Sequence, residues 1–217
     1  DLFTGGIRRL LDEGRVFPNT THDHLLTETA PGHATLATGT HPSRHGVVSS
    51  QWFVRRDGAW QDVENVMDPR APLIVDGDVR GASPTVLERE GIADWLLEAV
   101  DGSRVLSFSG KARGAVLLGG RSASHVYWFE PAVGRFVTST WYREREPGWL
   151  NQFNDHTLPI LGRDSVWTST VPAEVAHRSR PDTASYEGDG EHTYFPHRYV
   201  DAVERWGSDA TSAGASG

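Results

Sequence analysis

Residues 29–48 read TAPGHATLATGTHPSRHGVV. This stretch is rich in hydroxyl groups, glycines and histidines, and its only bulky aliphatic side chains are Leu36, Val47 and Val48. A segment of this composition is poor material for a hydrophobic core and good material for a functional site.

The stretch predicts a short helix whose first turn carries Thr29. Pro31 suits a first helical turn, where its missing N–H costs nothing, and residues 32–38 are compatible with a helix. The free N–H groups and the dipole at a helix N-terminus favour an anion and help a hydroxyl to ionise. Thr29 is therefore predicted to be a nucleophile that faces a phosphate-like group.

The same residues resemble the nucleophile segment of the alkaline phosphatase superfamily, in its type I phosphodiesterase/nucleotide pyrophosphatase branch and closest to its phosphate-monoesterase members. The resemblance rests on Thr29, on TLATG at residues 35–39 and on HGV at residues 45–47. It implies that Thr29 is the nucleophile and binds a zinc ion. It also implies an asparagine 21 positions after the nucleophile that holds the phosphoryl group, where this chain has Ser50. A serine hydroxyl donates a single hydrogen bond, so Ser50 is predicted to bind the substrate less firmly.

A second matching element is GKARGA at residues 110–115. The phosphate-monoesterase members carry a Lys-x-Arg pair here, which implies that Lys111 and Arg113 are catalytic and touch the phosphoryl oxygens. A monoester has one more ionisable charge than a diester, so a lysine and a forked arginine add stabilisation that a diester uses less fully. If the backbone is extended, the spacing places both side chains on one face. The alternative, two solvated cations at a strand-to-loop edge, stays open.

The resemblance further implies two zinc ions in a full-length parent. Their other ligands are expected before Asp1 and beyond the C-terminus, so Thr29 is the only predicted zinc contact and this chain is not expected to retain the ions. Three pairs or triplets imitate zinc ligands but are not predicted to bind zinc: His22-Asp23-His24, His41 with His45, and Asp155-His156, which is expected in a surface turn.

Alternating elements predict an α/β fold. We expect an alkaline phosphatase-like, mostly parallel sheet flanked by helices, incomplete, with a β-hairpin-containing insertion at roughly residues 104–160. One partial catalytic domain is expected over residues 1–206, and the low-complexity residues 207–217 are expected to be a disordered tail. The predicted helices span residues 4–13, 91–100 and 148–154. The predicted single strands span residues 104–109 and 114–119; two strand pairs are also predicted, one within 52–63 that turns at Asp57-Gly58 and one formed by 125–130 and 135–142. Residues 159–199 are expected to be loop.

Composition narrows the function classes. The net charge of −8 over 217 residues argues against a general nucleic-acid binder, which shows basic patches. No apolar run is long enough to span a membrane, and the absence of cysteine removes disulfides and thiol chemistry. The expected partner is a small phosphate-ester substrate, the resemblance implies a periplasmic or secreted location, and the oligomeric state is open.

These observations predict a phosphate-ester hydrolase of the alkaline phosphatase type. In the full-length parent it acts through a phosphothreonine at Thr29 with two zinc ions, whereas this chain alone is expected to be inactive. Two alternatives stay open: a nucleotide pyrophosphatase/phosphodiesterase in which the Lys-Arg pair is incidental, and a non-catalytic truncated product without the metal site. A sulfatase is disfavoured because Thr40 stands where an oxidisable cysteine or serine is needed. His33 and His45 either orient the site or, the favoured interpretation, pack within loops and bond to the backbone.

Overall fold

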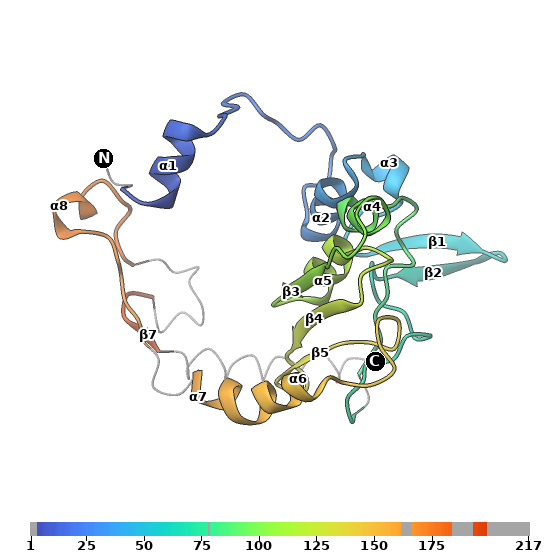
Figure 1. Cartoon of the computed structure of the whole chain (residues 1–217). Helices are drawn as coiled ribbons and strands as arrows, with labels where there is room; N and C mark the ends of the chain where they lie inside the picture. Colours follow the sequence, from blue (N-terminus) through green and yellow to red (C-terminus); the bar gives the residue numbers. More distant parts are fainter. Residues whose placement is uncertain (1–3, 78, 162–165, 184–192, 199–217) are drawn as a thin grey trace.

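The structure is a computed structural model that describes residues 4–77, 79–161, 166–183 and 193–198. Its elements follow one another along the chain as labelled in Figure 1. The helices are α1 (Gly6–Glu13), α2 (Thr29–Thr38), α3 (Pro42–His45), α4 (Ile92–Ala99), α5 (Ala112–Gly119), α6 (Gly148–Gln152), the π-helix η1 (Phe153–Thr157), α7 (Leu158–Leu161) and α8 (Ala173–Ala176). The strands are β1 (Trp52–Arg56), β2 (Ala59–Val63), β3 (Leu106–Ser109), β4 (His125–Glu130), β5 (Arg135–Val137), β6 (Val166–Trp167) and β7 (His197–Arg198).

The central sheet has three strands in the order β3-β4-β5. β3 runs parallel to β4, with Leu106 opposite His125, and β4 runs antiparallel to β5. Helix α5 connects β3 to β4, as parallel neighbours require a crossover. The predicted α/β class is confirmed, although the described sheet is mixed, with one parallel and one antiparallel pairing.

One predicted strand is wrong: residues 114–119 belong to helix α5. This run is GAVLLG, and all of its residues except Leu118 are buried. A short apolar run that is covered on most sides carries no polar alternation, so periodicity cannot separate a buried strand from a buried helix.

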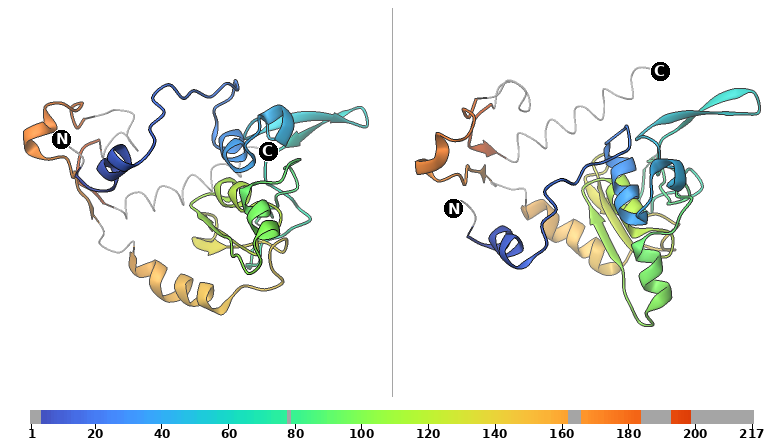
Figure 2. Two further views of the ribbon diagram at one scale, coloured as in Figure 1. Left: turned by 45° about the horizontal axis from the view of Figure 1, so that its top comes forward. Right: turned by 90° about the horizontal axis from the view of Figure 1, so that it is seen from above.

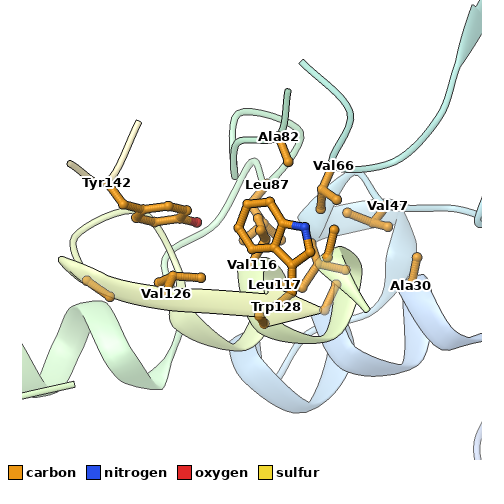
Figure 3. Close-up of a cluster of buried hydrophobic side chains, with 14 of the residues drawn as sticks. Ala30, Val47, Val66, Ala82, Leu87, Val116, Leu117, Val126, Trp128 and Tyr142 are labelled. Atoms are coloured by element: carbon orange, nitrogen blue, oxygen red, sulfur yellow. The ribbon is translucent and has the colours of Figure 1, made fainter. Parts of the chain in front are cut away.

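Helices cover both faces of the sheet (Figures 1 and 2). On one face α5 packs against β3 and β4, and α2 and α4 pack against α5. Val116 and Leu117 of α5 join Val126 and Trp128 of β4 in the buried core shown in Figure 3. On the other face Tyr127 stacks on Phe108 at a ring distance of 5.1 Å, and Trp149 of α6 meets Tyr127 edge-on at 5.1 Å; these contacts dock α6 on the sheet.

Several sequence predictions are confirmed outside the sheet centre. β1 and β2 form the expected antiparallel pair, and positive φ angles at Asp57 (52°) and Gly58 (82°) suit the type I′ turn that an Asp-Gly pair favours. β4 and β5 form the second hairpin, and α1, α4 and α6 match three expected helices. Residues 159–199 are predicted to be loop, which is wrong for their described part, because it contains most of α7, helix α8 and the short pair β6-β7. The predicted tail at residues 207–217 lies outside the described residues.

The segment between β2 and α4 is held by a buried carboxylate. Asp68 accepts hydrogen bonds from the Arg70 guanidinium at 2.9 and 3.1 Å and from the Ser83 hydroxyl at 2.6 Å. The Arg70 guanidinium, helped by Ser83, holds the pKa of Asp68 well below its usual range. Beside it, the Asp68 N–H donates to the Gly81 carbonyl at 2.9 Å and the Ala82 N–H donates to the Ala71 carbonyl at 3.0 Å. The two backbone runs therefore lie in direct contact.

Gly81→Ala should destabilise the chain by about 3 kcal/mol, because an added Cβ would overlap the backbone of Ala71 and Asp68, which cannot move as a flexible side chain can. Urea unfolding followed by tryptophan fluorescence measures this loss. Gly148→Ala is the matched control, since nothing lies within 4 Å of a Cβ there. Equal midpoints for the two variants would contradict the prediction.

Candidate active site

Thr29 is the first residue of α2, as the sequence predicts. The preceding residue, Glu28, caps the helix in an extended conformation, and its carbonyl accepts the N–H of Gly32 at 3.0 Å. The helix ends at Gly39, whose φ of 62° is the left-handed conformation that favours glycine. α2 buries the small residues Ala30, Ala34 and Ala37 and leaves Thr29 half-buried at its N-terminal end.

Lys111 and Arg113 lie where β3 passes into α5. Lys111 is extended (φ −141°, ψ 140°) and precedes the helix, whereas Arg113 is the second residue of α5. The Lys111 N–H donates to the Ser109 hydroxyl at 3.2 Å, which fixes this turn. The extended Lys-x-Arg geometry considered from the sequence is therefore wrong. The pair nevertheless follows the carboxyl end of a parallel strand, where α/β proteins place their ligand sites.

The first turns of α2 and α5 lie against each other. His33 of α2 donates from Nδ1 to the Thr29 carbonyl at 2.7 Å. A Cβ added at Gly114 of α5 would come within 3.6 Å of His33 Nε2 and 2.5 Å of Ser109 Oγ. His33 is thus within ordinary contact range of the first turn of α5, whereas the contact that requires glycine at position 114 is with Ser109 at the end of β3. The N-terminal ends of α2 and α5 therefore lie near each other. Two helix N-termini at one place favour an anion there.

Ser50 is linked to the N-terminus of α2 by a hydrogen bond with Glu28. The Ser50 N–H donates to the Glu28 carboxylate at 2.8 Å, and the Ser49 hydroxyl donates to it at 3.0 Å. The Ser50 N–H and then the two serine hydroxyls lower the pKa of Glu28, and the charge of Arg113 lowers it further. The structure therefore places Ser50 in direct contact with Glu28, the residue before Thr29.

Glu28 is the residue that sequence reasoning missed. The available signal was an acidic residue directly before the predicted nucleophile. Its partners, a pair of serines at positions 49 and 50, lie too far along the chain for local patterning to link them to it.

The two cations of the site have no fixed anionic partner. Within residues 4–77, 79–161, 166–183 and 193–198, neither Lys111 nor Arg113 forms a salt bridge. Arg113 is half-buried, and its buried Nε lacks a hydrogen-bond partner within the same ranges. Lys111 is exposed. A half-buried guanidinium with unused donors is suited to an anionic ligand such as a phosphoryl group.

His33 and His45 have different hydrogen-bond partners. His45 is buried; its Nδ1 accepts the Val47 N–H at 3.2 Å, so its Nε2–H faces the Thr35 hydroxyl at 3.1 Å. Burial lowers the pKa of His45 to about 4, which keeps the ring neutral. His45 is therefore buried and hydrogen-bonded to the nearby backbone, which is the interpretation that the sequence favours. His33 also bonds to the backbone, but to that of the predicted nucleophile itself.

The described part of the chain does not assemble a metal centre: no three His, Cys, Asp or Glu side chains there are grouped so that they could hold an ion. His41 contacts Asp23 at 3.2 Å, and the rings of His22 and His24 lie 5.4 Å apart. Asp155 of η1 pairs with Arg135 of β5 at 2.8 Å. Asp155 and His156 lie on the surface, as expected, but in a helix and not in a turn. The zinc contact of Thr29 stays a prediction.

The family model described as type I phosphodiesterase/nucleotide pyrophosphatase matches residues 2–208. The chain belongs to this family. Its curated relatives include alkaline phosphatase PhoV of Synechococcus elongatus, 35% identical over 84% of this chain and 33% of the relative. Alkaline phosphatase PafA of Elizabethkingia meningoseptica is 30% identical over 85% of this chain and 34% of the relative. The chain thus spans about a third of the length of these relatives.

The fold agrees with this family membership. The crystal structure of wild-type alkaline phosphatase PafA superposes with a TM-score of 0.80 at 27% identity, covering 94% of this chain and 40% of that chain. A PafA variant with substituted threonine, asparagine, lysine and arginine residues superposes with a TM-score of 0.72 at 26% identity, over 86% of this chain and 36% of that one. The structure therefore corresponds to part of an alkaline phosphatase fold. Among the described residues, no helix is both long and apolar enough to cross a membrane.

The stability of the chain should fall by about 2 kcal/mol between pH 7 and pH 5 because of His45 alone. Its folded pKa of about 4 lies below the ordinary 6.5, so the unfolded chain takes up the proton first. Stability is therefore complete above about pH 6.5 and declines as the pH falls towards 4. Urea unfolding at both pH values measures the loss. His45→Asn keeps an acceptor for the Val47 N–H and should lose this part of the pH dependence; an unchanged slope would refute the assignment.

Proposed function

We propose that the protein is a phosphate-ester hydrolase whose phosphoryl group binds between the N-termini of α2 and α5. The observation that carries the proposal is the packing of α2, which begins at Thr29, on α5, whose first turn holds the half-buried Arg113. Among the described residues, the Arg113 Nε has no hydrogen-bond partner. This arrangement supplies a hydroxyl nucleophile and preorganised positive charge, which are the two requirements of phosphoryl transfer.

In the proposed reaction the Thr29 oxygen attacks phosphorus. A bond forms between Thr29 Oγ and phosphorus, and the bond from phosphorus to the ester oxygen breaks, so the alcohol leaves after taking up a proton. Water then attacks the phosphothreonine, which releases inorganic phosphate and restores Thr29. Lys111 and Arg113 hold the non-bridging oxygens, with Ser50 as a weaker contact.

Alkaline phosphatase relatives suggest metal dependence in general, and the proposed metals are two zinc ions. The described residues provide no such centre, and Thr29 is the single proposed ligand. A bound zinc ion would act as a Lewis acid towards the hydroxyl and the phosphoryl oxygens. In the described part of the chain no side chain hydrogen-bonds to the Thr29 hydroxyl, so this chain alone is proposed to be inactive, as expected from its sequence.

The preference proposed is for monoesters. Support comes from the PafA variant, in which the substituted lysine and arginine are separated by one residue, as Lys111 and Arg113 are. Its threonine and asparagine have the spacing of Thr29 and Ser50. The second candidate is a nucleotide pyrophosphatase/phosphodiesterase, which the family description favours. A periplasmic or secreted location, which the family resemblance implies, is also proposed.

Thr29→Ala in the full-length protein should lower phosphate-ester hydrolysis at least about a thousandfold, because the attacking oxygen is removed. Steady-state assays with p-nitrophenyl phosphate and bis-p-nitrophenyl phosphate measure this. Thr27→Ala is the matched control, since Thr27 precedes α2 and is exposed. Retention of activity in Thr29→Ala would rule out the threonine nucleophile.

Arg113→Ala and Lys111→Ala should each lower kcat/KM for the monoester about a hundredfold and that for the diester about tenfold or less. The dianionic monoester depends more on the two cations than the monoanionic diester does. Arg55→Ala removes a cation from the exposed β1 strand and serves as control. Equal losses for both substrates would favour the phosphodiesterase candidate, and no loss would make the pair incidental.

A further inference from the structure

Glu28 places an exposed negative charge directly beside the proposed phosphate site. Its carboxylate lies at the N-terminus of α2, one residue before Thr29, and accepts the Ser50 N–H at 2.8 Å and the Ser49 hydroxyl at 3.0 Å. These donors belong to the loop that carries Ser50, the proposed phosphoryl contact. The carboxylate therefore engages donors from the same loop that a phosphoryl group would use.

Arg113 also contributes to the electrostatic environment of the proposed phosphate site. Its charge is near enough to lower the pKa of Glu28, yet its Nε makes no hydrogen bond among the described residues. Among the described residues, no salt bridge joins Glu28 and Arg113, so any interaction between the two charges acts at longer range. A phosphoryl group that reaches Arg113 enters the field of Glu28, and two like charges at such range repel each other.

We propose that Glu28 is an exposed carboxylate that takes up the Ser49-Ser50 donors and sets the affinity of the site for phosphoryl anions. This inference rests on the proposed function and deepens it. Substrate binding has to displace the carboxylate from these donors or tolerate its charge. The cost is larger for a dianion than for a monoanion, so Glu28 narrows the difference between monoesters and diesters that Lys111 and Arg113 create. Glu28 is in this sense a specificity-determining residue.

Glu28→Gln separates the charge of this side chain from its role as a hydrogen-bond acceptor. A glutamine keeps one carbonyl oxygen that can accept the Ser50 N–H, whereas the negative charge disappears. A carboxylate that only holds the Ser49-Ser50 loop in place would, on this change, leave phosphate binding the same or weaken it. A carboxylate that competes with the substrate gives the opposite result.

The test is isothermal titration of the full-length protein with inorganic phosphate at low ionic strength. Glu28→Gln should bind phosphate about tenfold more tightly than wild type, and the gain should shrink in 1 M NaCl. Glu28→Asp keeps the charge and should stay near the wild-type affinity. Glu98→Gln is the matched control, because it removes an equal charge from an exposed position on α4.

Kinetics provide the second readout. In Glu28→Gln, kcat/KM should rise about tenfold for p-nitrophenyl phosphate and about threefold for bis-p-nitrophenyl phosphate, since a monoanion feels half of the repulsion. Unchanged or weaker phosphate binding in Glu28→Gln overturns the inference, as does the absence of measurable binding in both proteins. Tighter phosphate binding without any turnover would support the inference while removing the proposed hydrolase, so the two failures are distinguishable.

Discussion

The close approach of α2 and α5 is the constraint on which the site depends. α2 buries Ala30 and Ala34, and α5 buries Ala112, Gly114 and Ala115, so the two helices meet through residues with almost no side chain. A larger residue at Gly114 would collide with Ser109. Since each helix starts at a site residue, their separation directly sets the distance between Thr29 and the Lys111-Arg113 turn. Packing of small residues is thus the structural origin of the site.

The sequence was informative where local chemistry is strong. Asp57-Gly58 marked the β1-β2 turn because few other residues adopt two successive positive φ angles. The Pro31 position indicated the start of α2, and the apolar residues Val105, Leu106 and Phe108 indicated β3, although Leu106 and Phe108 are exposed. In each case a covalent or short-range preference decides the conformation. The position of Thr29 at a helix N-terminus follows from the same kind of signal.

The sequence was uninformative where tertiary contacts decide. Residues 114–119 are apolar and mostly covered, so their burial by α2, α4 and the sheet rather than their own pattern makes them helical. The meeting of Glu28 with Ser49 and Ser50 spans more than twenty positions and depends on how residues 39–50 return to α2. Likewise, the pair His41 and His45 imitates metal ligands in the sequence. The burial of His45 and its hydrogen bond with the Val47 N–H show instead that it has a structural role.

An acidic chain can carry an anion site because electrostatics is local. The net charge of −8 is spread over the whole chain, and charges beyond about 8 Å are largely screened at physiological ionic strength. At the site itself two helix N-termini lie beside the half-buried Arg113 and the exposed Lys111. Such a concentration of donors is costly to leave without an anion, since like charges repel and buried donors need partners. The carboxylate of Glu28, which accepts hydrogen bonds from Ser49 and Ser50, lowers that cost when no substrate is bound, and for the same physical reason it opposes the anion that replaces it.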